Sequence, residues 1–211
     1  MEAVIFDWDG TLVDSLPGIF RANVEVLRAY DVPFDEGRYR AAYVPDWRLM
    51  YQRLGVPPEH LEAAGERWRE LYAAAPMPAA FEGVPEALER LSKAGHVLGL
   101  VTAGDRDVVE DQLERLGLSA LIPVRVCGSD DIASKPHPDP LLLALADLGL
   151  RGRPGDAAYI GDAPDDMRMA RAVGTRAIGI VSSLGTRDDL LAAGADEVST
   201  SVPAWVGRHL G

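Results

Sequence analysis

The pattern of apolar and polar positions divides the chain into a short first segment, a helical block and a longer alternating part. Residues 3–6 are four consecutive apolar residues, which is typical of a strand buried on both faces of a parallel sheet. From residue 84 onward, short apolar runs of strand length alternate with segments of helical periodicity. This alternation predicts an α/β fold with a doubly wound parallel sheet.

The strands expected in the alternating part are apolar runs at 97–102, 124–127, 157–160, 177–181 and about 197–198. The helices expected with them are amphipathic segments at 84–94, 107–116, 138–148, 164–173, 188–193 and 204–210. In open sheets of this kind ligands bind beyond the carboxyl ends of the strands. Polar residues that directly follow the strands are therefore the candidates for chemistry.

The block between the first strand and the alternating part shows no strand-like alternation. It begins with an amphipathic helix for which Ser15 is the expected N-cap. Further helices are expected between 35 and 75, with breaks at Pro45 and at 55–58. We therefore expect an inserted helical domain at 15–81 and a core domain made of 1–14 and 82–211.

Charge and composition narrow the classes of partner. The chain has 211 residues and a net charge of −12, which argues against nucleic acid and anionic membrane surfaces, because both require a basic face. Cys127 is the single cysteine, so no internal disulfide can form, and a buried thiol is the expected reading. Neither a signal-peptide pattern nor an apolar run of membrane-spanning length is present. A soluble, cytoplasmic protein is expected.

Two carboxylates follow the first strand. Asp7 and Asp9 are two positions apart, so their side chains start on the same side of extended backbone before the turn at Gly10 separates them. Two such acids cannot both ionise cheaply at the end of a buried strand without a cation. Mg²⁺, which prefers carboxylate and carbonyl oxygens, fits this demand. The alternative is a solvated acidic turn.

The ends of the later strands carry a complementary set of groups. This set consists of Thr102 with the following Ala103 and Gly104, then Lys135, then Asp162 and Asp166. The set can hold a divalent cation and a phosphoryl group together, because a metal and a lysine offset phosphate charge and backbone N–H groups can cradle it. A nearby aspartate could then attack phosphorus. The plainer alternatives are a helix cap for Asp162 and Asp166, a solvated loop lysine and an ordinary strand-end threonine.

These residues resemble the four motifs of the haloacid dehalogenase superfamily, in its phosphoglycolate-phosphatase-type branch with a helical cap inserted after the first motif. The resemblance covers essentially the whole chain and rests on residues 7–14, Thr102, residues 135–138 and residues 161–166. It implies a Rossmann-like core and a Mg²⁺-dependent phosphatase that hydrolyses a small phosphate monoester. No nucleic-acid or membrane partner is expected, on the grounds of the net charge given above, and the sequence leaves monomer and homodimer both open.

The resemblance also implies residue roles. Asp7 would be the nucleophile and a Mg²⁺ ligand, and would pass through an aspartyl-phosphate. Asp9 would be the general acid and base, with its backbone carbonyl on the metal. Thr102 and the N–H groups of Ala103 and Gly104 would bind phosphate. Lys135 would neutralise charge on the nucleophile and the phosphate. Asp162 would bind Mg²⁺, and Asp166 would support the metal shell or Lys135.

The helical insert would close over the site and choose the substrate. Its candidate specificity residues are Trp47, Arg48 and Arg53, because arginine suits a second anionic group. Arg106, just after the phosphate loop, is a similar candidate, although for each arginine an ordinary surface position is the alternative. A pyrophosphatase or sugar-phosphate mutase on the same fold, and a protein that binds a phosphate ligand without turnover, are the alternative functions.

Overall fold

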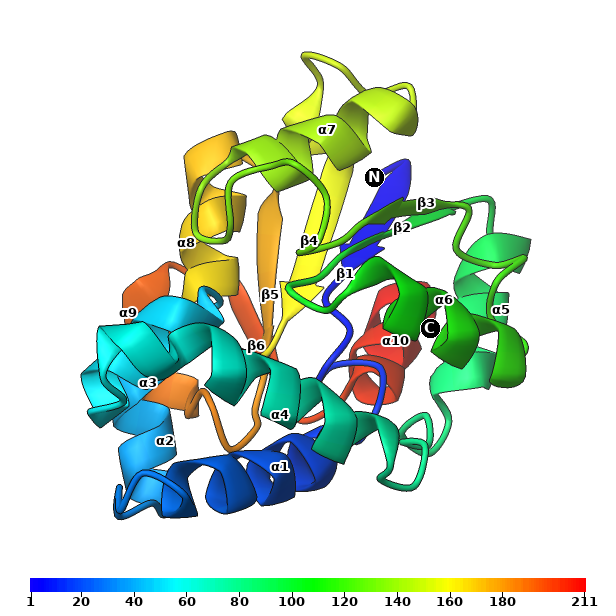
Figure 1. Cartoon of the computed structure of the whole chain (residues 1–211). Coiled ribbons are helices and arrows are strands. Elements are labelled where there is room, and N and C mark those ends of the chain that lie inside the picture. The colour runs from blue at the N-terminus through cyan, green and yellow to red at the C-terminus, as the bar shows by residue number, and fades with distance from the viewer. The chain divides into compact units, whose positions relative to one another are not determined.

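The computed structural model describes residues 1–211 and divides them into two compact units (Figure 1). One unit consists of Met1–Asp14 and Ala79–Gly211, and the other is Ser15–Pro78. Residues 79–81 belong with the first segment because Asp14 N–H donates to the Ala79 carbonyl and Phe81 N–H donates to the Leu12 carbonyl. The insert therefore ends at residue 78 in the structure, three positions before the expected boundary at 81.

The larger unit contains a six-stranded parallel sheet, which confirms the predicted α/β class. Its strands are β1 (Ala3–Phe6), β2 (Val97–Val101), β3 (Val124–Val126), β4 (Ala157–Gly161), β5 (Arg176–Ile180) and β6 (Glu197–Ser199). Their order in the sheet is β3-β2-β1-β4-β5-β6. The first strand of the chain thus lies at the centre of the sheet, as its apolar run predicts.

Helices cover both faces of this sheet. They are α5 (Val84–Lys93), α6 (Arg106–Arg115), α7 (Asp139–Asp147), α8 (Pro164–Val173), α9 (Arg187–Ala193) and α10 (Val202–Leu210), with a short 3₁₀ helix at Pro154–Asp156. Alternate residues of β1 enter two separate hydrophobic clusters: Val4 and Phe6 pack in one, Ala3 and Ile5 in the other. Side chains of successive strand residues point to opposite faces, so both faces of β1 are buried.

The register of β1 brings the functional strand ends together. Phe6 is paired with Leu100 of β2 on one side and with Ile160 of β4 on the other. The residues that leave these strands, including Asp7, Thr102 and Asp162, therefore emerge at one edge of the sheet.

The smaller unit is entirely helical. Its helices are α1 (Leu16–Arg28), α2 (Glu36–Ala42), α3 (Trp47–Leu54), a 3₁₀ turn (Pro58–His60) and α4 (Leu61–Ala73). The half-buried rings of Phe20 and Phe34 stack at 5.1 Å between centroids, and the Tyr51 hydroxyl makes a buried hydrogen bond to Asn23 Oδ1 (2.8 Å).

The expected capping role of Ser15 is wrong in one respect. Ser15 does precede α1, but its backbone is helical (φ −88°, ψ −21°) and its side chain accepts no hydrogen bond from the helix. A capping oxygen reaches the first free N–H groups from extended backbone, which Ser15 does not adopt.

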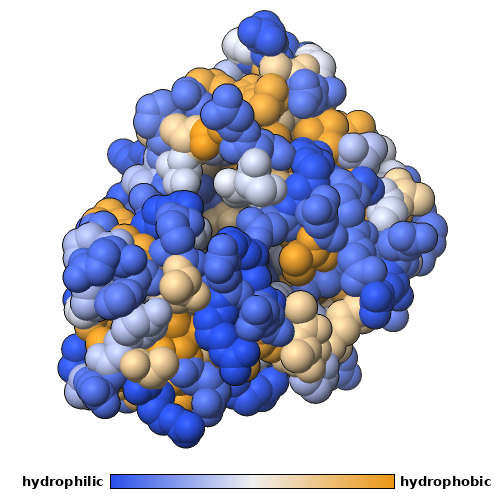
Figure 2. All heavy atoms as spheres, in the orientation of Figure 1, coloured by the Kyte–Doolittle hydropathy of each residue, from blue (hydrophilic) through white to orange (hydrophobic).

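The face of the molecule drawn in Figure 2 is mostly hydrophilic. No helix combines the length and the apolar character needed to cross a bilayer.

Candidate active site

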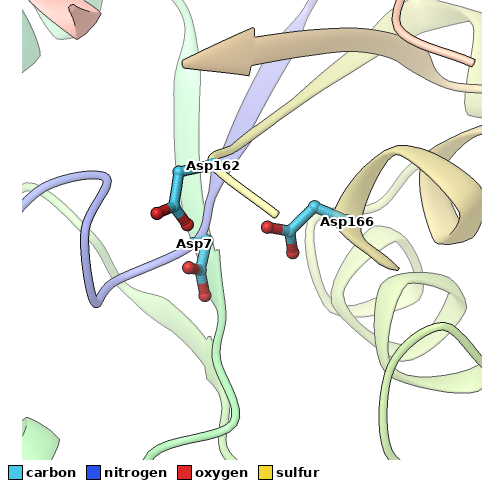
Figure 3. Close-up of side chains that lie close together, drawn as sticks. All are labelled: Asp7, Asp162 and Asp166. Atoms are coloured by element: carbon cyan, nitrogen blue, oxygen red, sulfur yellow. The ribbon is translucent and has the colours of Figure 1, made fainter. Parts of the chain in front are cut away.

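Three buried carboxylates gather where β1 and β4 end. Asp7 follows β1, and its N–H donates to the Ile160 carbonyl of β4 (2.8 Å). Asp162 follows β4, and Asp166 lies in the first turn of α8. One carboxylate oxygen from each of the three lies within 4.8 Å of the other two (Figure 3). The structure thus joins three acids from two motifs that are far apart in the sequence.

Lys135 reaches this cluster from the loop between β3 and α7. Its Nζ donates to Asp7 Oδ1 at 2.5 Å and to Asp166 Oδ1 at 2.9 Å, and the residue is only 7% exposed. Burial lowers the pKa of Lys135, but the carboxylates of Asp166 and Asp7 outweigh burial and raise this pKa above its ordinary value. The lysine is therefore a charged member of the cluster and not a solvated loop residue.

The oxygens of Asp166 are already engaged by the protein. Besides Lys135, Oδ1 contacts the Tyr159 hydroxyl (3.0 Å), and Oδ2 accepts from the Ala163 N–H (3.0 Å). Asp166 thus caps α8 and holds Lys135 at the same time. The Asp166 side chain packs so closely against residue 161 that this residue must be glycine, since a Cβ there would lie 2.4 Å from Asp166 Cγ.

Tyr159 is a site residue that the sequence analysis missed. It is fully buried in β4, and its hydroxyl lies 3.0 Å from both the Val101 carbonyl and Asp166 Oδ1. Its ring centroid is 5.6 Å from Lys135 Nζ. The signal was present: a tyrosine in an otherwise aliphatic buried strand needs a hydrogen-bond partner for its hydroxyl.

Asp162 differs from Asp166 in its hydrogen bonding. It is 1% exposed, and its Oδ2 has no hydrogen-bond partner. Burial, with Asp7 and Asp166 close by, raises the pKa of Asp162 well above its ordinary value. A buried carboxylate oxygen without a donor is costly unless a cation compensates it.

Asp7, like Asp162, has a pKa that burial raises. Burial raises the pKa of Asp7 to about 7, although Lys135 acts in the opposite direction. The cluster has three acids and a single lysine, so a second cation would complete its charge balance. Asp7 and Asp162 supply the hard oxygen ligands that suit a divalent ion such as Mg²⁺. The residues present therefore fit a metal at this position.

Asp9 is not one of the three clustered carboxylates. Its side chain lies beside the loop that follows β2. The chain turns directly after Asp9, at Gly10, whose φ is +78°. A Cβ placed on Gly104 would lie 3.5 Å from Asp9 Oδ2 and 3.4 Å from Thr102 Oγ1. The Asp9 carboxylate and the Thr102 hydroxyl thus lie beside the same loop.

Thr102 is buried directly after β2. Its N–H donates to the Val126 carbonyl (2.9 Å), and its Oγ1 accepts from the Gly104 N–H (3.0 Å). The Gly104 N–H, expected to bind phosphate, therefore lies against the threonine hydroxyl in this structure. Ala103, between them, is exposed.

Three of the candidate specificity residues, Trp47, Arg48 and Arg53, belong to the helical unit. Arg48 donates to both oxygens of Glu62, at 2.8 and 3.1 Å, and its Cζ lies 4.3 Å from the centroid of the Trp47 ring. Trp47 packs closely over Gly65, where a Cβ would lie 2.5 Å from the ring. Arg53 is exposed in the last turn of α3. Arg48 and Trp47 thus have structural contacts within their own unit.

The comparisons with known proteins agree with this geometry. The family model described as haloacid dehalogenase-like hydrolase matches residues 4–180. A probable phosphatase, IndB, from Dickeya dadantii is 35% identical over 90% of this chain and 85% of its own length. An N-acetylmuramic acid 6-phosphate phosphatase from Pseudomonas aeruginosa is 32% identical, over 83% of this chain and 80% of its own length. A phosphoglycolate phosphatase from Synechococcus elongatus is 33% identical over 93% of this chain and 91% of its own length.

Solved structures show the same architecture. A hydrolase from Pseudomonas syringae superposes with a TM-score of 0.87 at 28% identity, covering 99% of this chain and 98% of its own. CbbY from Rhodobacter sphaeroides, solved in complex with phosphate, gives a TM-score of 0.77 at 25% identity, with 96% and 95% covered. On these matches, the chain belongs to the haloacid dehalogenase-like hydrolase family and is an enzyme of its phosphatase class, similar to phosphoglycolate phosphatases.

Proposed function

We propose that this enzyme hydrolyses a small anionic phosphate monoester with Mg²⁺, by transferring the phosphoryl group to Asp7. The observation that carries the proposal is the contact between Asp7 and Lys135 at 2.5 Å, beside an Asp162 oxygen that has no partner. This arrangement provides a nucleophile, a fixed positive charge and a vacant ligand oxygen within one buried cluster.

The metal would be held by Asp7 and Asp162, with the backbone carbonyl of Asp9. When bound, Mg²⁺ would supply positive charge that offsets the phosphate oxygens. Lys135 supplies a second positive charge at the nucleophile, so that a phosphate dianion can approach the Asp7 carboxylate. Asp166 keeps Lys135 in place, because it bonds the ammonium and is itself bonded to Tyr159 and Ala163.

The proposed reaction has two steps. An Asp7 oxygen forms a bond to phosphorus while the bond to the ester oxygen breaks, and Asp9 donates a proton to that leaving oxygen. Water then attacks phosphorus, Asp9 accepts its proton, and the bond between phosphorus and Asp7 breaks. Inorganic phosphate leaves and both aspartates return to their starting states. Thr102 would bind phosphate oxygens throughout, with the Ala103 and Gly104 N–H groups, and the Gly104 N–H would exchange its bond with Thr102 for one to phosphate.

The helical unit would act as a cap that excludes water and selects the substrate. Trp47, Arg48 and Arg53 remain our candidates for recognising a second anionic group, with Arg48 exchanging Glu62 for the ligand. The named activities of two relatives support an acidic substrate, because phosphoglycolate and N-acetylmuramic acid 6-phosphate each carry a carboxylate besides the phosphate. The cytoplasmic location and a monomeric or homodimeric state remain predictions.

The test is phosphate release from a panel of small phosphate monoesters, with and without Mg²⁺. The panel includes phosphoglycolate and sugar phosphates, and pyrophosphate is assayed separately. We expect Mg²⁺-dependent turnover that falls roughly 10³-fold or more in Asp7→Asn, because catalysis through a covalent intermediate is lost when the nucleophile is removed. Full activity in Asp7→Asn would refute the nucleophile assignment. Isomerisation of a hexose phosphate would indicate a mutase, and calorimetric binding without turnover would indicate a binding protein.

A further inference from the structure

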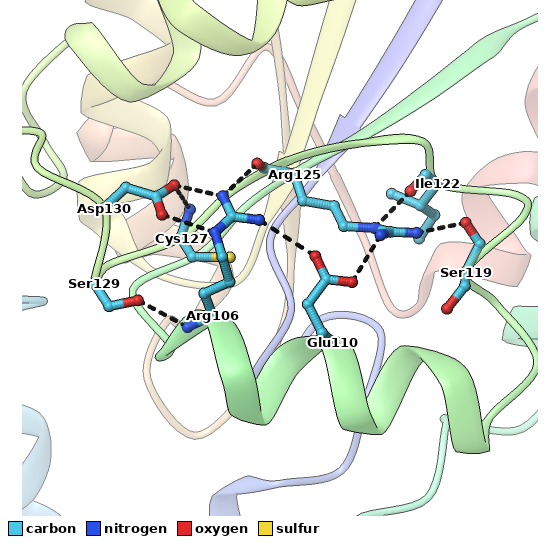
Figure 4. Close-up of polar contacts among 8 residues, drawn as sticks. All are labelled: Arg106, Glu110, Ser119, Ile122, Arg125, Cys127, Ser129 and Asp130. Carbon is cyan, nitrogen blue, oxygen red and sulfur yellow. Dashed lines mark hydrogen bonds and ion pairs between the residues drawn. The ribbon is translucent and has the colours of Figure 1, made fainter.

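Arg106 does not present its guanidinium to a ligand. Its Nε and Nη2 donate to the two oxygens of Asp130, at 2.9 and 2.7 Å (Figure 4). Nη2 also donates to the Arg125 carbonyl (3.0 Å), and Nη1 donates to Glu110 Oε1 (3.2 Å). A guanidinium has five N–H donors, and four bonds to the protein already use most of them. The residue that the sequence offered as an anion ligand is therefore part of an ion-pair network.

Asp130 is held in place by hydrogen bonds within its own turn as well as by Arg106. Its Oδ2 accepts from the Cys127 N–H (2.9 Å), and its N–H donates to the Cys127 carbonyl (3.1 Å). Ser129 adds a contact, since its Oγ accepts from the Arg106 backbone N–H (2.9 Å). Hydrogen bonding from Arg106 lowers the pKa of Asp130 below its ordinary value, so the pair is ionised at neutral pH.

This pair spans the two loops that carry phosphate-binding candidates. One loop holds Thr102 and Gly104 and ends where α6 begins at Arg106; the other starts at Cys127 and continues to Lys135. The two backbones touch, because Gly128 N–H donates to the Gly104 carbonyl (2.9 Å) and a Cβ on Gly128 would lie 2.1 Å from the Ala103 oxygen. Because the two loops are in direct contact at Gly104 and Gly128, we expect a shift in one loop to displace the other.

We propose that Arg106 and Asp130 are positioning residues whose ion pair fixes the Thr102 loop against the segment that carries Lys135. The inference rests on the proposed function, which assigns phosphate to Thr102 and Lys135. A partly exposed ion pair contributes little to overall stability. Misplacement of binding groups, in contrast, is costly for binding and catalysis. The effect of the pair should therefore be larger on phosphate affinity than on thermal unfolding.

The experiment measures binding of inorganic phosphate by calorimetry in the full chain with Mg²⁺, together with kcat and KM. In Asp130→Asn and in the milder Arg106→Lys we expect the Kd for phosphate to rise about tenfold and kcat/KM to fall similarly. The double variant should be no worse than the weaker-binding single variant, since both changes break one contact. The matched control is Asp111→Asn, which breaks the exposed pair with Arg115 on the same helix (2.9 Å) and should leave Kd within twofold.

Amide hydrogen exchange supplies a readout that does not depend on catalysis. We expect faster exchange at residues 102–105 in Asp130→Asn, and no change there in Asp111→Asn. A phosphate Kd within twofold of wild type in both Arg106→Lys and Asp130→Asn overturns the inference, whether or not exchange rises. A wild-type chain that neither binds phosphate nor hydrolyses any ester would instead refute the proposed function. The exchange rates alone would then decide whether the pair holds the two loops, and unchanged rates would overturn that as well.

Discussion

At the residue scale, the two acids of the β4–α8 segment have different environments although the sequence presents them as a similar pair. Asp166 receives hydrogen bonds on both oxygens, while Asp162 Oδ2 receives none. The family resemblance implied separate roles for them, with Asp162 on the metal and Asp166 in support of the metal shell or Lys135, but the residue pattern alone does not show the contacts on which that difference rests. Those contacts come from Lys135, which lies in a distant loop, and from Tyr159 in β4 itself.

Because Asp162 Oδ2 has no hydrogen-bond partner, we expect this residue to lower thermal stability in the absence of metal and to bind the metal when it is present. In the metal-free chain, Asp162→Asn should raise the melting temperature, because it removes a buried acid whose pKa burial raises. The same variant should lose the increase in melting temperature that Mg²⁺ gives the wild type, since a ligand is gone. The matched control is Asp165→Asn, whose carboxylate pairs with Arg168 (2.6 Å) and is not one of the three clustered acids. Thermal scans with and without Mg²⁺ measure both effects, and an undiminished Mg²⁺ shift in Asp162→Asn would exclude it as a ligand.

The two lysines of the chain offer a direct comparison of buried and exposed charge. Lys135→Met should lower the free energy of unfolding by about 3 kcal/mol or more, because it leaves Asp7 and Asp166 buried without their cation. Lys93→Met removes a solvent-exposed pair with Glu89 and should change it by less than about 0.5 kcal/mol. Urea unfolding of the metal-free proteins at pH 7.5 provides the measurement. Equal effects in the two variants would show that Lys135 is not the counter-charge of the cluster.

At the element scale, the periodicity of the sequence predicted the strands and helices well but not their ends. The expected strand at 97–102 is observed at Val97–Val101, and the one expected at 177–181 is observed at Arg176–Ile180. Apolar runs identify the buried middle of an element, whereas its ends depend on contacts with distant residues. Thr102, for example, leaves β2 and yet still donates to the Val126 carbonyl. Ser15 shows the same limit, because residue type alone does not reveal its helical backbone.

The junction of β4 and α8 makes a prediction of its own. Gly161→Ala should displace Asp166, since the new Cβ would lie 2.4 Å from its Cγ. We expect a loss of about 2 kcal/mol in the free energy of unfolding, accompanied by reduced turnover as Lys135 loses its support. The control is Gly155→Ala, where a Cβ would meet nothing within 4 Å. Denaturant unfolding and steady-state kinetics test the pair of variants, and a Gly161→Ala protein as stable and active as Gly155→Ala would contradict the proposed role of this close contact.

At the scale of the whole molecule, motif order and alternation were sufficient to predict the sheet, its central first strand and the family. The sequence also predicted that Asp7, Lys135, Asp162 and Asp166 would meet, because parallel strands release their following residues at one edge. It did not predict the Arg106–Asp130 pair or the role of Tyr159. Both depend on the packing of loops and strands that are distant in sequence and follow no short motif.

The central claim is that Asp7 is the nucleophile that attacks phosphorus, with Lys135 and Asp162 around it. The most direct test is a crystal structure of the full chain grown with Mg²⁺ and beryllium fluoride, which mimics a phosphoryl group on a carboxylate. The account predicts beryllium bonded to a carboxylate oxygen of Asp7, with Lys135 near its fluorides and Mg²⁺ bound by Asp7 and Asp162. Beryllium bonded to Asp9, or held away from any carboxylate while Mg²⁺ binds elsewhere, would contradict it.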